Sequence, residues 1–167
     1  MGNNNDKALG TAFDYLEYLG TSDMTPEELK SEFYRLACTF YVSPGNERTY
    51  VVLSGLNENM PAAIQLFEKL LADAQVNKEA YDNLVGDILK ARADAKLNQG
   101  QNFSRLMNYA MYGPKSPATN LLTEAELASM NPQELVDRIH NQNNYKHRIL
   151  YYGCLLYTSD AATTPYV

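Results

Sequence analysis

The feature that most constrains the fold is a change of hydrophobic period within residues 15–71. A helical pattern ends before Cys38, and residues 38–43 and 49–54 are then rich in β-branched and aromatic side chains, which favour strands. The turn formers Pro44-Gly45 lie between these two runs. The sequence therefore predicts an antiparallel hairpin between helices, with apolar residues on both of its faces.

Helix-start signals surround this hairpin. Thr25-Pro26-Glu27-Glu28 combines an N-cap, a proline at the first helical position and a capping-box glutamate. Further starts are expected at Asn59, Asn77, Thr123 and Asn131. Apolar spacing predicts helices over residues 8–19, 25–36, 59–74, 77–98 and 103–112, and two more that begin at Thr123 and at Asn131. Ile64 is expected to face inward, and a break at Gly100 is expected after the helix that ends at about Asn98.

A third strand is predicted at His147–Tyr152, ending at Gly153. Three strands make a small sheet, so we expect an α+β domain in which helices pack on an antiparallel sheet that lacks some strands. Residues 1–153 form this partial domain. Residues 154–167 are small and polar without any period, and we expect them to be a non-native or disordered tail.

Composition excludes several classes of function. The chain has 167 residues and a net charge of −6, with no basic cluster, so nucleic acid is not expected as a partner. No membrane segment and no signal pattern are found, which leaves a cytoplasmic or a periplasmic location open. Two cysteines make no disulfide framework; Cys38 is expected to be a buried, inert thiol, and Cys154 borders the tail.

Several short motifs occur in a fixed order along the chain: Leu19-Gly20-Thr21, Cys38-Thr39-Phe40, Arg48-Thr49-Tyr50, Ser54-Gly55-Leu56 and residues 145–153. Their order resembles the pitrilysin/insulinase family, the zinc metallopeptidases with an inverted H-x-x-E-H motif. The resemblance covers roughly residues 3–153 and is greatest to the non-catalytic C-terminal half of the large bacterial members. It implies an incomplete metallopeptidase-half domain, similar to the mitochondrial processing peptidase fold.

In such proteins two halves form a clamshell around a chamber. One half binds zinc, and the degenerate half closes the chamber and helps to hold an extended peptide. The resemblance thus implies a chain without catalysis of its own, whose partners are the catalytic half and, through the whole enzyme, a peptide substrate. The family's substrate-contacting arginine and tyrosine would follow Gly153, so Arg48 and Tyr50 on the hairpin are not given that role.

The residues that zinc catalysis needs are missing from the matching helix. Two histidines on one helical turn would bind the metal, with a glutamate between them to activate water. Residues 11–19 contain no histidine, and Glu17 is a lone carboxylate. His140 and His147 fall on different predicted elements, so neither is expected to bind metal. We therefore expect no catalytic, cofactor-binding or metal residues here, and zinc only in the partner half.

Two other classes of function stay open. No G-x-S-x-G elbow or phosphate-binding loop is present, so an independent enzyme has no recognisable constellation of residues. The acidic pairs Glu27/Glu28 and Glu124/Glu126 occupy first helical turns, where they suit the helix dipole. The main alternative is a stand-alone α+β protein-interaction module.

Overall fold

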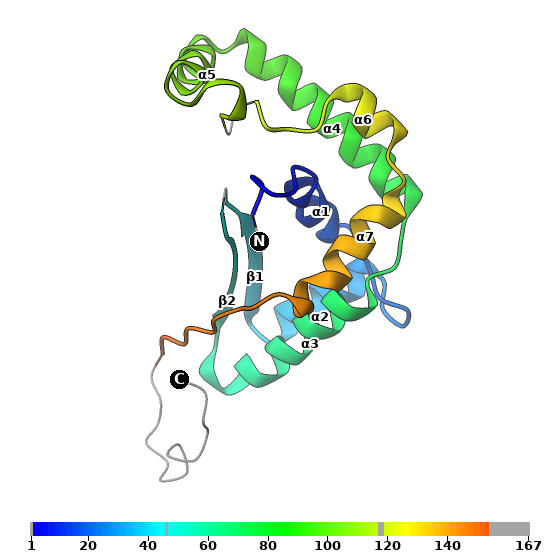
Figure 1. Ribbon diagram of the computed structural model, residues 1–167. Coiled ribbons are helices and arrows are strands. Elements are labelled where there is room, and N and C mark those ends of the chain that lie inside the picture. The colour runs from blue at the N-terminus through cyan, green and yellow to red at the C-terminus, as the bar shows by residue number, and fades with distance from the viewer. Residues whose placement is uncertain (1, 46, 117–118, 154–167) are drawn as a thin grey trace.

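The computed structural model describes residues 2–45, 47–116 and 119–153. The sheet is one hairpin, and Figure 1 shows most of the helices on one side of it. The described elements are α1 Leu9–Leu16, α2 Pro26–Arg35, β1 Cys38–Pro44, β2 Thr49–Gly55, η1 Asn57–Asn59, α3 Met60–Asp73, α4 Lys78–Leu97, α5 Gln99–Tyr112, η2 Gly113–Lys115, α6 Glu124–Ser129, α7 Pro132–His140 and η3 Asn141–Asn144. The predicted α+β class is confirmed.

The hairpin forms as the change of period predicts. β1 and β2 are antiparallel, with Cys38 opposite Gly55 and Pro44 opposite Thr49. Alternate residues of β1 from Cys38 onward point toward the helices, and the residues between them are exposed. Tyr41 and Tyr50 lie on the outer face, so this face keeps large side chains in solvent.

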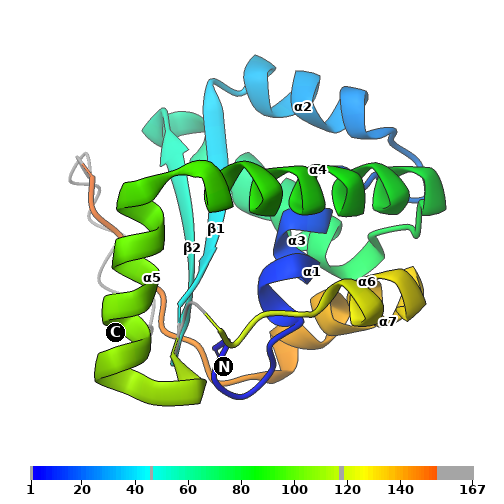
Figure 2. The same ribbon diagram turned by 90° about the horizontal axis from the view of Figure 1, so that it is seen from above.

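The core lies where α1 meets the hairpin and α7. Apolar side chains of α1 are buried against α7, β1 and α4, while α3 packs on both strands and on α7. Figure 2 shows α1 between the hairpin and the α6–α7 pair, with α4 crossing above it. Phe40 joins the strands to the helices through ring contacts with Phe33 and Phe67, at centroid distances of 4.9 and 5.0 Å.

Most of the predicted helix starts are confirmed by their caps. Thr25 with Glu28 and Thr123 with Glu126 form complete capping boxes. The side chains of Asn77 and Asn131 also accept bonds from the first helical turn. Asn59 is the exception, because its amide donates instead to the carbonyl oxygen of Leu36 at 2.8 Å.

Three local predictions are wrong in detail. The α4 helix ends at Leu97, close to the predicted end at about Asn98, but the break falls at Asn98 and not at Gly100, because the Asn98 side chain accepts from Gln101 N at 3.0 Å and starts α5. Gly100 therefore lies inside α5. Ile64, expected inward, is exposed, and Ala63 and Leu66 take the buried positions of α3. The first helix ends at Leu16, three residues earlier than predicted, although Leu19 is still buried.

The third strand is absent from the described part of the chain. Residues 147–152 have no assigned secondary structure, and Ile149 and Leu150 are 82% and 85% exposed. Strand composition measures how well a side chain fits a sheet, whereas a strand also needs a neighbour to share backbone hydrogen bonds. Within the described residues the sheet has two strands only. Cys154 and the predicted tail lie outside the described residues. Among the described residues, none of the helices is long and apolar enough to cross a membrane.

Candidate functional site

Residues 11–19, which the resemblance matches to a zinc-binding helix, overlap α1, and the inner face of α1 is occupied by buried side chains. Leu9, Phe13 and Leu16 are buried in the core. Tyr15 is also buried, and its hydroxyl donates to Asn77 O at 2.6 Å and accepts from Asn77 N at 2.8 Å. Desolvation by this burial raises the pKa of Tyr15. Through these contacts α1 has a structural role, because Tyr15 holds Asn77 at the start of α4.

The carboxylates of this helix lie on its outer side. Asp14 and Glu17 are both exposed, one turn apart. Desolvation by neighbouring groups, followed by the negative charge of Glu17, raises the pKa of Asp14. Two carboxylates alone at this spacing supply neither the nitrogen ligands nor the geometry of a zinc peptidase site.

The two histidines are placed in separate surroundings. His140, at the end of α7, has Nε2 3.2 Å from the carbonyl oxygen of Ala74. His147 lies beyond η3, with Nδ1 3.1 Å from Tyr145 O. Among residues 2–45, 47–116 and 119–153, no group of three His, Cys, Asp or Glu side chains could hold a metal ion. Cys38 is buried and free, as expected.

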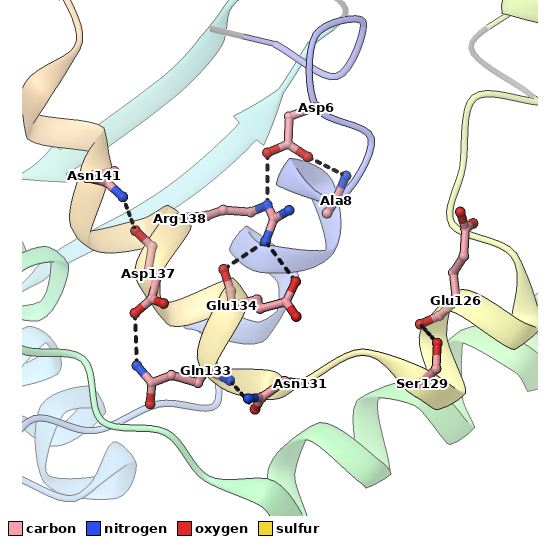
Figure 3. Close-up of polar contacts among 10 residues, drawn as sticks. All are labelled: Asp6, Ala8, Glu126, Ser129, Asn131, Gln133, Glu134, Asp137, Arg138 and Asn141. Atoms are coloured by element: carbon pink, nitrogen blue, oxygen red, sulfur yellow. Dashed lines mark hydrogen bonds and ion pairs between the residues drawn. The ribbon is translucent and has the colours of Figure 1, made fainter.

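Figure 3 shows a polar site centred on Arg138, which joins α7 to the N-terminal segment. Arg138 Nε donates to Asp6 Oδ2 at 2.8 Å, and Nη1 donates to the Glu134 carbonyl oxygen at 2.9 Å. The other oxygen of Asp6 accepts from Ala8 N at 3.0 Å, next to the start of α1. The Asp6 and Arg138 side chains keep only 21% and 30% of their surface in solvent. This partly buried ion pair fixes the start of the chain to α7.

A second ion pair lies beside the first. Lys7 Nζ donates to Glu126 Oε1, and the other Glu126 oxygen accepts from Thr123 N at 2.8 Å. The Lys7 hydrogen bond, with the Thr123 backbone and hydroxyl, lowers the pKa of Glu126 to about 2. Both pairs border an open depression of about 300 Å³. Lys7 and Arg138, the cations that line this depression, are each already paired with a carboxylate. The two ion pairs therefore hold the N-terminal segment against α6 and α7, and we call the pair made by Arg138 and Asp6 the Arg138 clamp.

The Gly20-Thr21-Ser22 loop is likewise occupied by structural bonds. Ser22 N and Oγ donate to Asp73 Oδ2 at 2.9 and 2.5 Å, and these bonds lower the pKa of Asp73. Gln75 N donates to Gly20 O at 2.9 Å. The Leu-Gly-Thr motif therefore fastens the turn after α1 to the end of α3.

The sequence analysis did not predict the Arg138 clamp, nor the Tyr15 anchor, by which we mean the two bonds between the Tyr15 hydroxyl and the Asn77 backbone. Asp6 and Arg138 are 132 positions apart, so no local spacing links them. Tyr15 reads as one more apolar position on an amphipathic helix, and only its buried hydroxyl reveals the bond to Asn77. The substrate-contacting residues expected after Gly153 lie outside the described residues.

These elements define an α+β fold in which helices pack on a two-stranded antiparallel sheet. No protein-family model matches the sequence, and a comparison with curated proteins finds no match either. Among solved structures, the chain is similar to the periplasmic protease PqqL from Escherichia coli, with a TM-score of 0.64 and 14% sequence identity over 84% of this chain. The matched region is 15% of PqqL. At this identity the likeness shows the fold, and it agrees with the predicted fold relationship to pitrilysin-type proteases.

Proposed function

We propose that the chain is a segment of the non-catalytic half of a pitrilysin-type zinc peptidase. It forms part of a chamber wall, docks on the catalytic half and supports peptide binding there. The observation that carries this proposal is the combination of a protease-like fold with an α1 helix whose inner face packs into the core. Zinc belongs to the catalytic half, and this chain performs no hydrolysis by itself.

The charged residues of the chain support a structural role. Arg138 and Lys7 are each paired with a carboxylate that belongs to another segment. A site that binds or turns over substrate needs groups free to change partners, whereas these groups hold the N-terminal segment against α6 and α7. The clamp thus stabilises a wall without taking part in chemistry.

Peptide hydrolysis tests the proposal. The purified chain, given zinc and a mixture of fluorogenic peptides, should show no metal-dependent cleavage. The full-length protein encoded at the same locus should cleave them and should carry H-x-x-E-H outside this segment. Zinc-dependent cleavage by the chain alone, abolished by His140→Ala or His147→Ala, would contradict the proposal.

The competing function, a stand-alone interaction module, makes a different prediction for the same locus. A coding sequence that does not continue into a catalytic half would favour it. The large side chains exposed on the outer hairpin face, Tyr41 and Tyr50, are the feature that supports this alternative.

A further inference from the structure

The α5 helix exposes its apolar face to solvent and turns polar residues toward the rest of the chain. Its large apolar residues recur at helical spacing and form one stripe, which we call the α5 stripe: Phe103, Leu106, Met107 and Met111, with Ala110 between them. All of these residues are exposed; Phe103, Leu106 and Met111 keep 61–64% of their surface in solvent. The half-buried positions of α5 are polar instead, at Arg105 and Asn108.

This orientation is set by the contacts of α5 with the rest of the chain. α5 packs mainly on the end of α4 and on η2, and none of its residues is buried. Figures 1 and 2 show it at the edge of the molecule, turned sharply away from α4. A helix normally buries its apolar stripe, because exposing it to water is unfavourable. An outward apolar stripe of this kind is typical of surfaces that bind another molecule.

We infer that the α5 stripe is a docking surface covered by the remainder of a longer protease chain. This inference rests on the proposed function and names the element through which the segment docks. The matched region is only 15% of PqqL, so a segment of this fold occurs within a chain several times longer. The longer chain supplies the missing cover.

The charges indicate what the covering surface is made of. Arg105 is the only charged residue of α5, and it lies opposite the stripe. The surface that covers the stripe is accordingly apolar and uncharged, and it binds by packing. A second copy of this chain fits less well, because each copy carries a net charge of −6 and two copies repel each other.

Methionine oxidation provides an intrinsic probe. Met107 and Met111 lie on the stripe, while Met24 and Met130 pack partly buried against the core and serve as internal controls. Hydrogen peroxide is applied to the 167-residue chain and to the full-length protein from the same locus, and each methionine is followed by peptide mass spectrometry. In the full-length protein, oxidation of Met111 should slow on the order of tenfold, because susceptibility follows exposure of the sulfur. Met24 and Met130 should change little.

A matched pair of variants gives a second readout. Leu106→Glu places a charge in the stripe, and Gln101→Glu places one on the opposite side of α5. In the isolated chain both should leave the melting temperature nearly unchanged, since both positions are exposed. In the full-length protein Leu106→Glu alone should lower the melting temperature or release the segment to limited proteolysis.

Three results would overturn the inference: equal Met111 oxidation in both proteins, Met111 protection that appears in the isolated chain as its concentration rises, or a locus that encodes no longer chain. The second result would assign the stripe to a second copy. Peptide cleavage by the same full-length preparation separates the two proposals. If the full-length protein cleaves peptide but Met111 is not protected, the docking surface is rejected and the proposed function stands. If Met111 is protected but no peptide is cleaved, the proposed function is rejected and the docking surface stands.

Discussion

Tyr15 carries more of the tertiary structure than its place on a short helix suggests. Its hydroxyl both donates to and accepts from the backbone of Asn77, 62 residues away, and its ring packs edge-on against Tyr81 at 5.7 Å. Tyr81 in turn donates to Leu127 O at 2.7 Å. Two tyrosines thus connect α1, α4 and α6, so part of the tyrosine content of this chain is explained by buried hydroxyls that are hydrogen-bonded.

Replacing Tyr15 by phenylalanine tests this connection. Tyr15→Phe keeps the ring but leaves Asn77 N–H without its acceptor and Asn77 O with only the bond from Tyr81 N at 3.1 Å, which should cost about 1–3 kcal/mol of unfolding free energy. Urea denaturation followed by far-ultraviolet circular dichroism measures the loss. Tyr34→Phe, at a side chain that is 88% exposed, is the matched control and should be neutral. Equal stability of the two variants would show that the anchor contributes nothing.

Elements with local signals could be predicted from the sequence, and elements that depend on distant partners could not. The capping boxes at Thr25 and Thr123 involve residues three positions apart, so the sequence contains the whole interaction. The hairpin is also local, since Thr39 and Ser54, whose hydroxyls lie 3.1 Å apart, are only 15 positions apart in the sequence. The strand predicted at 147–152 needs a neighbouring strand, which composition does not reveal. The Arg138 clamp depends on contacts across nearly the whole chain, so no spacing could have revealed it.

Gly55 gives a prediction at the scale of the hairpin. A Cβ placed on Gly55 would lie 2.4 Å from Cys38 Sγ and 2.6 Å from Ala37 O, so β1 and β2 could not keep their register. Gly55→Ala should therefore destabilise the chain by about 1–3 kcal/mol or more, the usual cost of overpacking. Thermal denaturation is the measurement.

Gly86 is the matched control for this substitution. It lies inside α4, and a Cβ there would meet nothing within 4 Å. Gly86→Ala should stabilise the chain by about 0.5–1 kcal/mol, because alanine loses less backbone freedom than glycine on entering a helix. If Gly55→Ala raised the melting temperature as Gly86→Ala does, the close approach of Cys38 and Gly55 would be wrong.

At the scale of the whole molecule, two ion pairs join the N-terminal segment to α6 and α7. Lys7 reaches Glu126 across 119 positions, and Asp6 reaches Arg138 across 132. The fold of residues 2–153 is therefore closed by contacts between its first residues and α6–α7, while α5 stands apart with its stripe exposed. The proposed docking surface thus lies on a helix none of whose residues is buried in this body.

The Glu126 pair predicts how stability depends on pH. The carboxyl has a pKa of about 2 in the fold against an ordinary value of 4.5, so folding favours its charged form. The stabilisation is present above pH 4.5 and is lost as pH falls from 4.5 toward 2. Glu126→Gln should hence be less stable than the parent chain at neutral pH and equal to it near pH 2, measured by urea denaturation across this range.

Glu124→Gln is the control for this pH dependence. Glu124 lies in the same first turn of α6, so it shares the helix-dipole effect and lacks the Lys7 and Thr123 bonds described for Glu126. A stability difference between Glu126→Gln and the parent that did not shrink on acidification would argue against the carboxylate as the cause.

Zinc content tests most directly the proposal that this chain is the non-catalytic part of a zinc peptidase. The 167-residue chain and the full-length protein from its locus are each loaded with zinc, dialysed and analysed by mass spectrometry for bound metal. The full-length protein should retain one zinc ion per molecule, lost on substitution of its H-x-x-E-H histidines, and the isolated chain should retain none. One zinc ion retained per isolated chain, and lost in His140→Ala or His147→Ala, would contradict the proposal.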